Sequence, residues 1–168
     1  LYEVTTHIPL FIDIPRESGD IVEDFVQITD IAPTITAALD VEGLEPDGRS
    51  LLPTIAEETS LDRKFVLAEE AHTQRRWMIR TESQKLIHLV DGDTICRYCD
   101  VDHAPETELY DMETDPLESQ NLVKIRTDDV ADLRARGAEA AAQFEVRRPA
   151  GETDNEGIEY EDEEEVYN

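Results

Sequence analysis

Two cysteines and two histidines have the residue types and spacing that could build a metal site. Cys96 and Cys99 form a C-x-x-C pair, His103 follows in the same loop, and His88 precedes it as a candidate fourth ligand. Two thiolates with two imidazoles match a closed zinc site, which needs four ligands. A single C-x-x-C pair is a weak zinc signature, and a hairpin disulfide or two free thiols are the alternatives. We therefore predict no metal ligand in this chain and keep zinc as an alternative that metal titration would test.

The elements around this loop are predicted to form a small antiparallel sheet. Four strand-like runs, at residues 64–69, 75–81, 84–90 and 107–111, are joined by polar turns. Three of these runs are close in sequence, which predicts an antiparallel meander. Residues 127–145 then have the spacing of an amphipathic helix with Thr127 as its N-cap, and one face of the sheet gives this helix a surface to pack on. We interpret its apolar stripe as core, and its members are Val130, Leu133, Gly137, Ala140, Ala141 and Phe144.

The first part of the chain has separate elements, which would belong to a larger α/β sheet. Residues 7–14 are predicted to form a buried strand, because they form an apolar run with only His7 and Asp13 as polar residues. Asp30 is predicted to cap a helix that ends at about Leu39. A short helix around 50–57 follows after a loop, and Ser50 is its predicted cap.

The chain is strongly acidic, with a net charge of −26 from 41 acidic and 15 basic residues. This charge argues against nucleic acid and anionic membrane surfaces as partners, because both require positive charge. Residues 151–168 contain nine acids and no base, which leaves −17 on residues 1–150. The spread of acidity indicates a salt-accumulating halophile, in which screening relieves the self-repulsion. Residues 147–168 have almost no core residues and are predicted to be an acidic disordered tail.

One long string gives the chain its family resemblance. Residues 108–122 read ELYDMETDPLESQNL, which locally is a strand end followed by an Asp-Pro turn. The string closely resembles the C-terminal signature of the sulfatase family, in the alkaline-phosphatase-like superfamily, where a strand precedes DP.E..NL and a last helix. Four more stretches resemble that family in the same order, namely LYEVTTHIPLFIDIP at 1–15, ITDIAPTI at 28–35, DGRSLLP at 47–53 and WMIRTESQKLI at 77–87.

The resemblance implies an α/β fold in two parts. Residues 1–58 would be the C-terminal end of an alkaline-phosphatase-like α/β domain, and residues 59–146 a small antiparallel-sheet subdomain with one C-terminal helix. The chain begins with Leu1 and leads at once into a predicted strand, so we expect it to be part of a longer protein. An export signal would then lie upstream, and the compartment stays open, with the cytoplasm slightly favoured.

The resemblance also implies a chemistry that this chain does not carry alone. Sulfatases use a formylglycine made from the Cys or Ser of a C/S-x-P-S-R string, beside a divalent cation held by oxygen ligands. This sequence contains no such string, and the family's sulfate-contacting lysine would fall before Leu1. We therefore expect no catalytic residue and no cofactor in this chain alone. The complete enzyme would use Ca²⁺ or Mg²⁺ and act on a sulfated small molecule or glycan.

Four residues are candidates for substrate binding on the strength of the resemblance: His7, His72, Arg75 and Arg76. In sulfatases this subdomain can border the substrate cleft, and guanidinium groups pair well with anions. The alternative for His7 is a local structural role at a strand start. The alternative for the other three is a solvated loop that balances its own charges.

The leading interpretation is the C-terminal portion of a sulfatase-like hydrolase that acts on sulfate esters. The first alternative is a fragment of a phosphodiesterase or phosphonate hydrolase of the same superfamily. The second is a non-catalytic remnant or interaction module, which would fold alone and stay monodisperse at high salt. The leading interpretation instead predicts poor solubility in isolation, because the strand at 7–14 would leave an unpaired edge and apolar faces.

Overall fold

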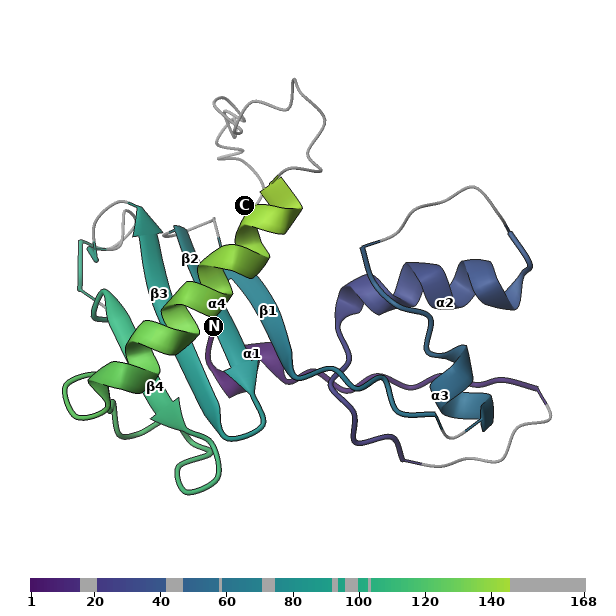
Figure 1. The fold of residues 1–168 in the computed structure, drawn as a ribbon, viewed down its shortest axis with the longest axis horizontal. Helices are drawn as coiled ribbons and strands as arrows, with labels where there is room; N and C mark the ends of the chain where they lie inside the picture. The colour runs from purple at the N-terminus through teal and green to yellow at the C-terminus, as the bar shows by residue number, and fades with distance from the viewer. Residues whose placement is uncertain are drawn as a thin grey trace, which may run out of the picture.

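A four-stranded antiparallel sheet and one long helix form the larger part of the computed structural model (Figure 1). The structure describes residues 1–15, 21–41, 47–57, 59–70, 75–91, 94–95, 100–102 and 104–145. Its strands are β1 (Phe65–Glu70), β2 (Arg75–Thr81), β3 (Gln84–Asp91) and β4 (Thr107–Asp111), in the order β1-β2-β3-β4. Helix α4 (Thr127–Glu145) crosses one face of this sheet. The predicted meander and the predicted C-terminal helix are both confirmed.

Helix α4 closes the main apolar core. Alternation along the strands sends every second side chain to the helix-covered face. The core there contains the buried residues Trp77, Ile79, Leu86, Leu109 and Leu133. Gly137 lies directly against the Trp77 ring, because a side chain in its place would overlap that ring. Val130, Leu133 and Gly137 of the predicted stripe therefore pack on the sheet, and the Phe144 side chain lies outside what the structure describes.

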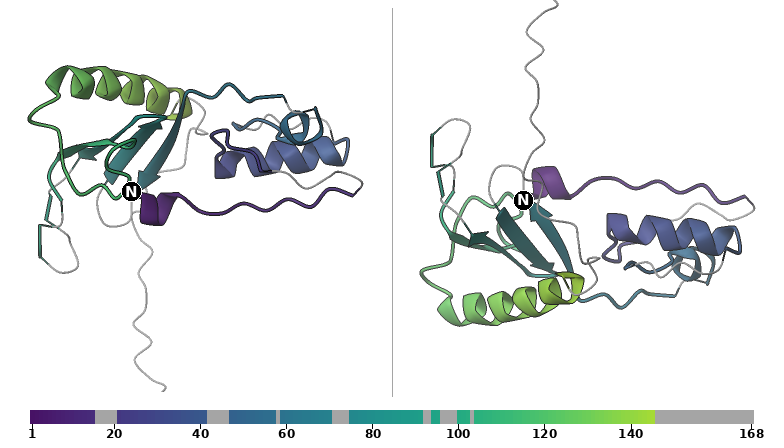
Figure 2. Two further views of the ribbon diagram at one scale, coloured as in Figure 1. Left: turned by 90° about the horizontal axis from the view of Figure 1, so that it is seen from below. Right: turned by 90° about the horizontal axis from the view of Figure 1, so that it is seen from above.

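The opposite face of the sheet is covered by the start of the chain. Leu1, Tyr2 and the short helix α1 (Glu3–Thr6) lie there, on the side of the sheet away from α4 (Figure 2). A second apolar cluster of Met78, Ile87, Tyr110 and Met112 packs against Leu1 and Tyr2. The sheet is thus enclosed between the last helix and the first six residues of the chain.

A second group of helices lies beside the sheet, past the β1 side (Figure 1). It consists of the 3₁₀ helix η1 (Ile28–Asp30), α2 (Ile31–Ala38) and α3 (Leu52–Glu57). Asp30 takes the N-cap position of α2, as predicted, but its carboxylate makes no capping bond to that helix. The carboxylate is fully buried and accepts bonds from the Arg63 guanidinium and from the backbone N–H groups of Gln27 and Arg49. It therefore joins three segments instead of ending one helix.

The predicted buried strand at residues 7–14 is wrong for this chain. The segment is extended but unpaired, and Phe11 is 91% exposed. It runs away from α1 alongside α2 and α3 (Figure 2). A strand forms only when neighbouring backbone groups accept and donate its hydrogen bonds. Among the described residues no strand pairs with this segment, so the apolar run has no sheet to join.

Candidate functional site

A buried lysine lies on the face that the start of the chain covers. Lys85 on β3 has a side chain with 0% exposure, and its Nζ lies 2.8 Å from Glu118 Oε1 and 3.1 Å from Glu3 Oε1. Glu118 also accepts a 2.7 Å hydrogen bond at Oε2 from the backbone N–H of Glu3. We call Lys85, Glu3 and Glu118 the Lys85 network. It joins α1, β3 and the loop after β4.

A second polar group, the Glu108 cluster, lies on the same face and consists of Glu108, Tyr2, Tyr110 and Arg76. The hydroxyl groups of Tyr2 and Tyr110 both donate to Glu108 Oε2, at 2.7 and 2.6 Å. Arg76 Nη1 lies 3.7 Å from Glu108 Oε1. Burial, followed by the bond to the Glu108 carboxylate, raises the pKa of Tyr2 to about 12. The same two causes raise the pKa of Tyr110, so both hydroxyl groups stay protonated donors.

The strand pattern explains why these polar side chains share one face. Lys85 and Ile87 alternate with Leu86 on β3, and Glu108 and Tyr110 flank Leu109 on β4. In the register of the sheet, Lys85 pairs with Tyr110 and Ile87 pairs with Glu108. The apolar partners of this alternation, Leu86 and Leu109, belong to the core under α4. The opposite face therefore receives the Lys85 cation from β3 and the Glu108 anion from β4.

A hydrogen-bonded loop positions Glu118. The Asp115 carboxylate accepts bonds from Ser119 and from the Gln120 backbone N–H, which shapes the turn at Pro116. Those backbone bonds lower the pKa of Asp115. Glu118 itself has φ of 55°, a left-handed conformation that costs free energy in a residue other than glycine. The residue that adopts this costly conformation is the one whose carboxylate pairs with Lys85.

Asn121 fixes the far end of the same loop. Its Oδ1 accepts from the backbone N–H groups of Leu109 and Val123, and Leu122 N–H returns to the Leu109 carbonyl. The loop is therefore tied back to β4 before α4 begins. Asn121 thus caps backbone N–H groups of both β4 and the loop.

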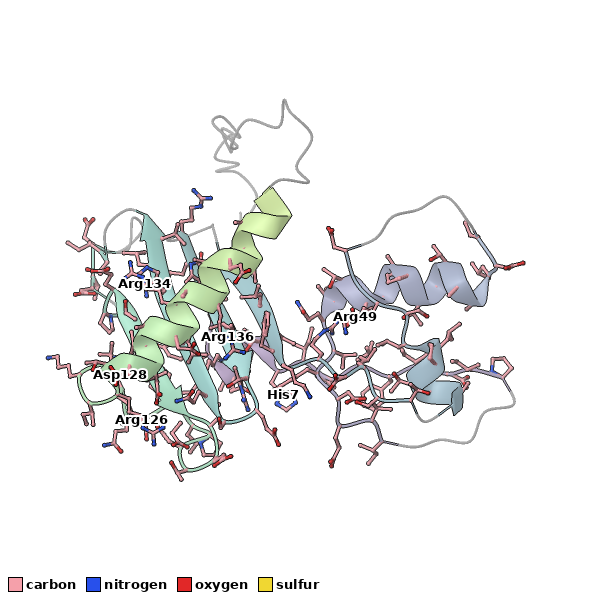
Figure 3. All side chains as sticks on the ribbon, viewed as in Figure 1. His7, Arg49, Arg126, Asp128, Arg134 and Arg136 are labelled. Atoms are coloured by element: carbon pink, nitrogen blue, oxygen red, sulfur yellow. The ribbon has the colours of Figure 1, made fainter. Side chains whose placement is uncertain are left out.

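The three predicted substrate-binding residues that the structure describes differ in exposure and in partners. The His7 side chain is 82% exposed, with Nδ1 3.7 Å from Glu3 Oε2, and it lies between the sheet and the α2–α3 helices (Figure 3). Arg75 begins β2 with an exposed side chain. Arg76 is buried and donates to the carbonyl groups of Pro105 and Ala104. His72 is outside the described residues, so substrate binding by these four stays a prediction.

The zinc alternative also falls largely outside the described residues, which exclude Cys96, Cys99 and His103. Its fourth residue, His88, is described and buried, with Nδ1 2.9 Å from Thr107 Oγ1 and its ring edge-to-face on Trp77. Burial, with help from Arg134, lowers the pKa of His88. A packed, hydrogen-bonded neutral imidazole accounts for this residue.

The network residues were missed as functional candidates, although the sequence contained a signal. Tyr2 and Glu3, Lys85, and Glu118 each lie inside one of the strings that resemble the sulfatase family. In the described part of the chain no group of three or more His, Cys, Asp or Glu side chains is placed to hold a metal ion. The side chains of the Lys85 network and the Glu108 cluster instead bind other parts of the chain. The arrangement can position a backbone segment.

No helix within the described ranges has the length and apolar character needed to cross a bilayer.

Three comparisons place the chain among known proteins. Residues 1–140 match the family model described as N-sulphoglucosamine sulphohydrolase, C-terminal. The chain is 31% identical over 137 residues to an N-acetylglucosamine-6-O-sulfatase of Bacteroides thetaiotaomicron, with 73% of this chain and 22% of that relative covered. It is similar to a solved structure in complex with its substrate D-glucosamine-2-N,6-O-disulfate, with a TM-score of 0.54 and 29% identity over 74% of this chain and 25% of that one.

The fold extends to a different hydrolase. The phosphonate monoester hydrolase of Agrobacterium radiobacter matches with a TM-score of 0.51 and 23% identity, covering 74% of this chain and 26% of that one. At that identity the match shows the fold alone. The chain spans between 22% and 26% of the length of these three relatives.

Proposed function

This chain belongs to the family of N-sulphoglucosamine sulphohydrolase C-terminal domains, and we propose that it completes a hydrolase that cleaves sulfate esters. The observation that carries the proposal is the family match over residues 1–140, together with the meeting of three family-like strings in one buried network. The chain would supply the small sheet and the segment at its N-terminal end. The reacting groups would lie in the larger α/β part of the protein.

The exposed apolar residues of the first part of the chain support a larger neighbouring domain. Phe11, Ile21 and Leu39 are 91%, 85% and 68% exposed. Water-exposed side chains of this size in one region mark a surface that another part of a protein covers. In the proposed complete protein, the larger domain covers the exposed side chains of residues 7–14 and packs beside α2 and α3. The division at residues 1–58 and 59–146 is part of this proposal.

A sulfated amino sugar is the proposed substrate class. The support is the relative named as an N-acetylglucosamine-6-O-sulfatase and the similar structure that holds a disulfated glucosamine. His7, His72, Arg75 and Arg76 remain the proposed anion-contacting residues of this chain. The family resemblance points to Ca²⁺ or Mg²⁺, which prefer carboxylate and amide oxygens. The described side chains form no such ligand group. The family resemblance implies that the metal would be held by the larger α/β part of the complete enzyme.

The test is a hydrolysis assay on the complete polypeptide whose reading frame contains this chain. Sulfate release from N-acetylglucosamine 6-sulfate should exceed hydrolysis of a phosphonate monoester of equal size. A preference for the phosphonate ester would favour the phosphonate hydrolase alternative instead. A reading frame with no domain upstream of Leu1 would leave the non-catalytic alternative.

We also propose a halophilic source for this acidic chain, which predicts that activity rises with KCl between about 0.1 and 1 M as charge repulsion is screened.

A further inference from the structure

We infer that Lys85 is a positioning residue, whose ion pairs with Glu3 and Glu118 fix the register of residues 1–6 on the sheet. Lys85 is fully buried, and its two partners come from segments that are distant in sequence. The ammonium group has both of its carboxylate partners only when α1 and the loop after β4 are both in place. The network thereby selects one position for the start of the chain.

The chemistry of the network favours a register role over a simple contribution to stability. Moving a lysine and two carboxylates out of water costs free energy that their mutual attraction only partly returns. An apolar side chain of similar size would fill the same space without that cost. The best-attested use of such buried polar groups is to specify one arrangement among several that would pack equally well.

A shift of the segment by one residue would break the network. Glu3 is followed by Val4, which is 88% exposed in the observed register. In the shifted register Val4 would face the Lys85 ammonium group, which would lose one carboxylate. Glu118 would lose its bond from the Glu3 N–H. Lys85 would keep Glu118 but lose Glu3, and partly breaking a buried charge network is unfavourable, so the observed register is selected against its neighbours.

Neighbouring groups make the same segment doubly anchored. Arg80 Nε lies 3.6 Å from Glu3 Oε1, which adds a second cation from β2. Thr6 Oγ1 lies 3.4 Å from Lys85 Nζ. Tyr2, on the other side of Glu3, is held by Glu108. Residues 2, 3 and 6 are therefore each bound to the sheet by a side chain, while the exposed residues 8–12 beyond them are not.

Hydrogen exchange on the 168-residue chain tests the register directly. In Lys85→Met, backbone amides of residues 3–7 should exchange at least about tenfold faster, while the β2 and β3 amides keep their relative protection. The matched control is Lys64→Met, because Lys64 is an exposed lysine paired with Asp62 at the surface. Unchanged exchange at residues 3–7 in Lys85→Met would overturn the inference.

A second variant covers the case in which Lys85→Met does not fold. Glu118→Gln keeps a side chain of the same size and removes the charge and one acceptor, so exchange at the Glu3 amide should still rise. A combined Glu3→Gln, Lys85→Met, Glu118→Gln variant removes all three charges of the Lys85 network and should recover the unfolding midpoint, but the fast exchange at residues 3–7 should remain. Recovery of both midpoint and protection would mean that the ion pairs carry no register information.

The functional consequence rests on the proposed hydrolase activity. In the complete protein, Lys85→Met should lower kcat about tenfold per folded molecule and leave KM within about twofold, because a displaced segment misplaces reacting groups. A loss of activity no larger than the loss of folded protein would contradict the positioning role. An unmodified protein without sulfate ester hydrolysis would refute the proposed function, while the exchange data would still decide on the register.

Discussion

Replacement of Gly137 by alanine tests how α4 is seated on the sheet. A Cβ atom at this position would lie 2.5 Å from Cη2 and 3.1 Å from Cε3 of Trp77, and closer still to Cζ3. Ordinary carbon contacts are about 3.5–4.0 Å. Trp77 is only 5% exposed and lies among the residues of the main core. Either the ring or the whole helix must therefore move.

Two opposing terms set the magnitude of this change. Alanine has the better helix propensity, which by itself would stabilise the protein by about 1 kcal/mol. Forcing an extra methyl group into a packed core costs about 1–3 kcal/mol, and an overlap with a buried ring belongs at the upper end of that range. The expected net result is a decrease of about 2 kcal/mol in the free energy of unfolding.

Urea unfolding followed by circular dichroism would measure this difference. Ala138→Gly is the matched control, because Ala138 is exposed on the same helix turn and should lose only the propensity term of about 1 kcal/mol. Combining Gly137→Ala with Trp77→Phe should recover part of the loss, since phenylalanine lacks the indole benzene ring that meets the new methyl group. If Gly137→Ala is as stable as the parent protein, the close seating of α4 on Trp77 is incorrect.

Three further changes have signs that follow from the buried polar groups. Asp30→Asn should cost about 3–5 kcal/mol at pH 7, because it leaves the Arg63 guanidinium without its carboxylate, as chemical denaturation would show. Burial opposes ionisation of Asp30, but the bonds from Arg63 and the backbone outweigh it and lower the pKa, so the parent should lose this stability only as the pH falls below 3.8. Tyr2 has a raised pKa, so its stabilising effect should be complete below pH 10 and lost towards about pH 12, and tyrosinate absorbance should show a late step that Tyr2→Phe removes. The lowered pKa of His88 predicts stability that is present above pH 6.5 and lost below it, and NMR titration of its ring would reveal a pKa below that of a solvent-exposed histidine.

The sheet and its helix were predictable because their determinants are local. Residues 64–69, 75–81, 84–90 and 107–111 were expected as strands, and the structure places strands within one residue of each expected boundary. The first three strands are antiparallel neighbours with short connections, and such pairing needs no information from distant parts of the chain. The helix at 127–145 has the same advantage, since its apolar spacing matches the face it must cover.

The failures involve groups whose partners are far away in the sequence. Residues 7–14 have the composition of a buried strand, but a strand needs neighbours that the described residues do not supply. Asp30 has the residue type and position of a helix cap, yet Arg63 and two backbone N–H groups claim its carboxylate. Local propensity cannot tell whether the Asp30 carboxylate accepts a bond from the first turn of its own helix or pairs with a distant arginine.

The Lys85 network shows where pattern reasoning stops and where family-like strings add information. A period-2 strand with a lysine on one face predicts that this face meets water, because charged side chains are seldom buried. Here the face is covered by residues 1–6, and the covering segment brings Glu3 as the compensating charge. The YE, KLI and DPLE strings contain both carboxylates and the lysine, although up to 115 positions separate them. A single contact in the folded chain brings these distant charged residues together. The three strings are therefore better interpreted as one docking site than as three separate sites.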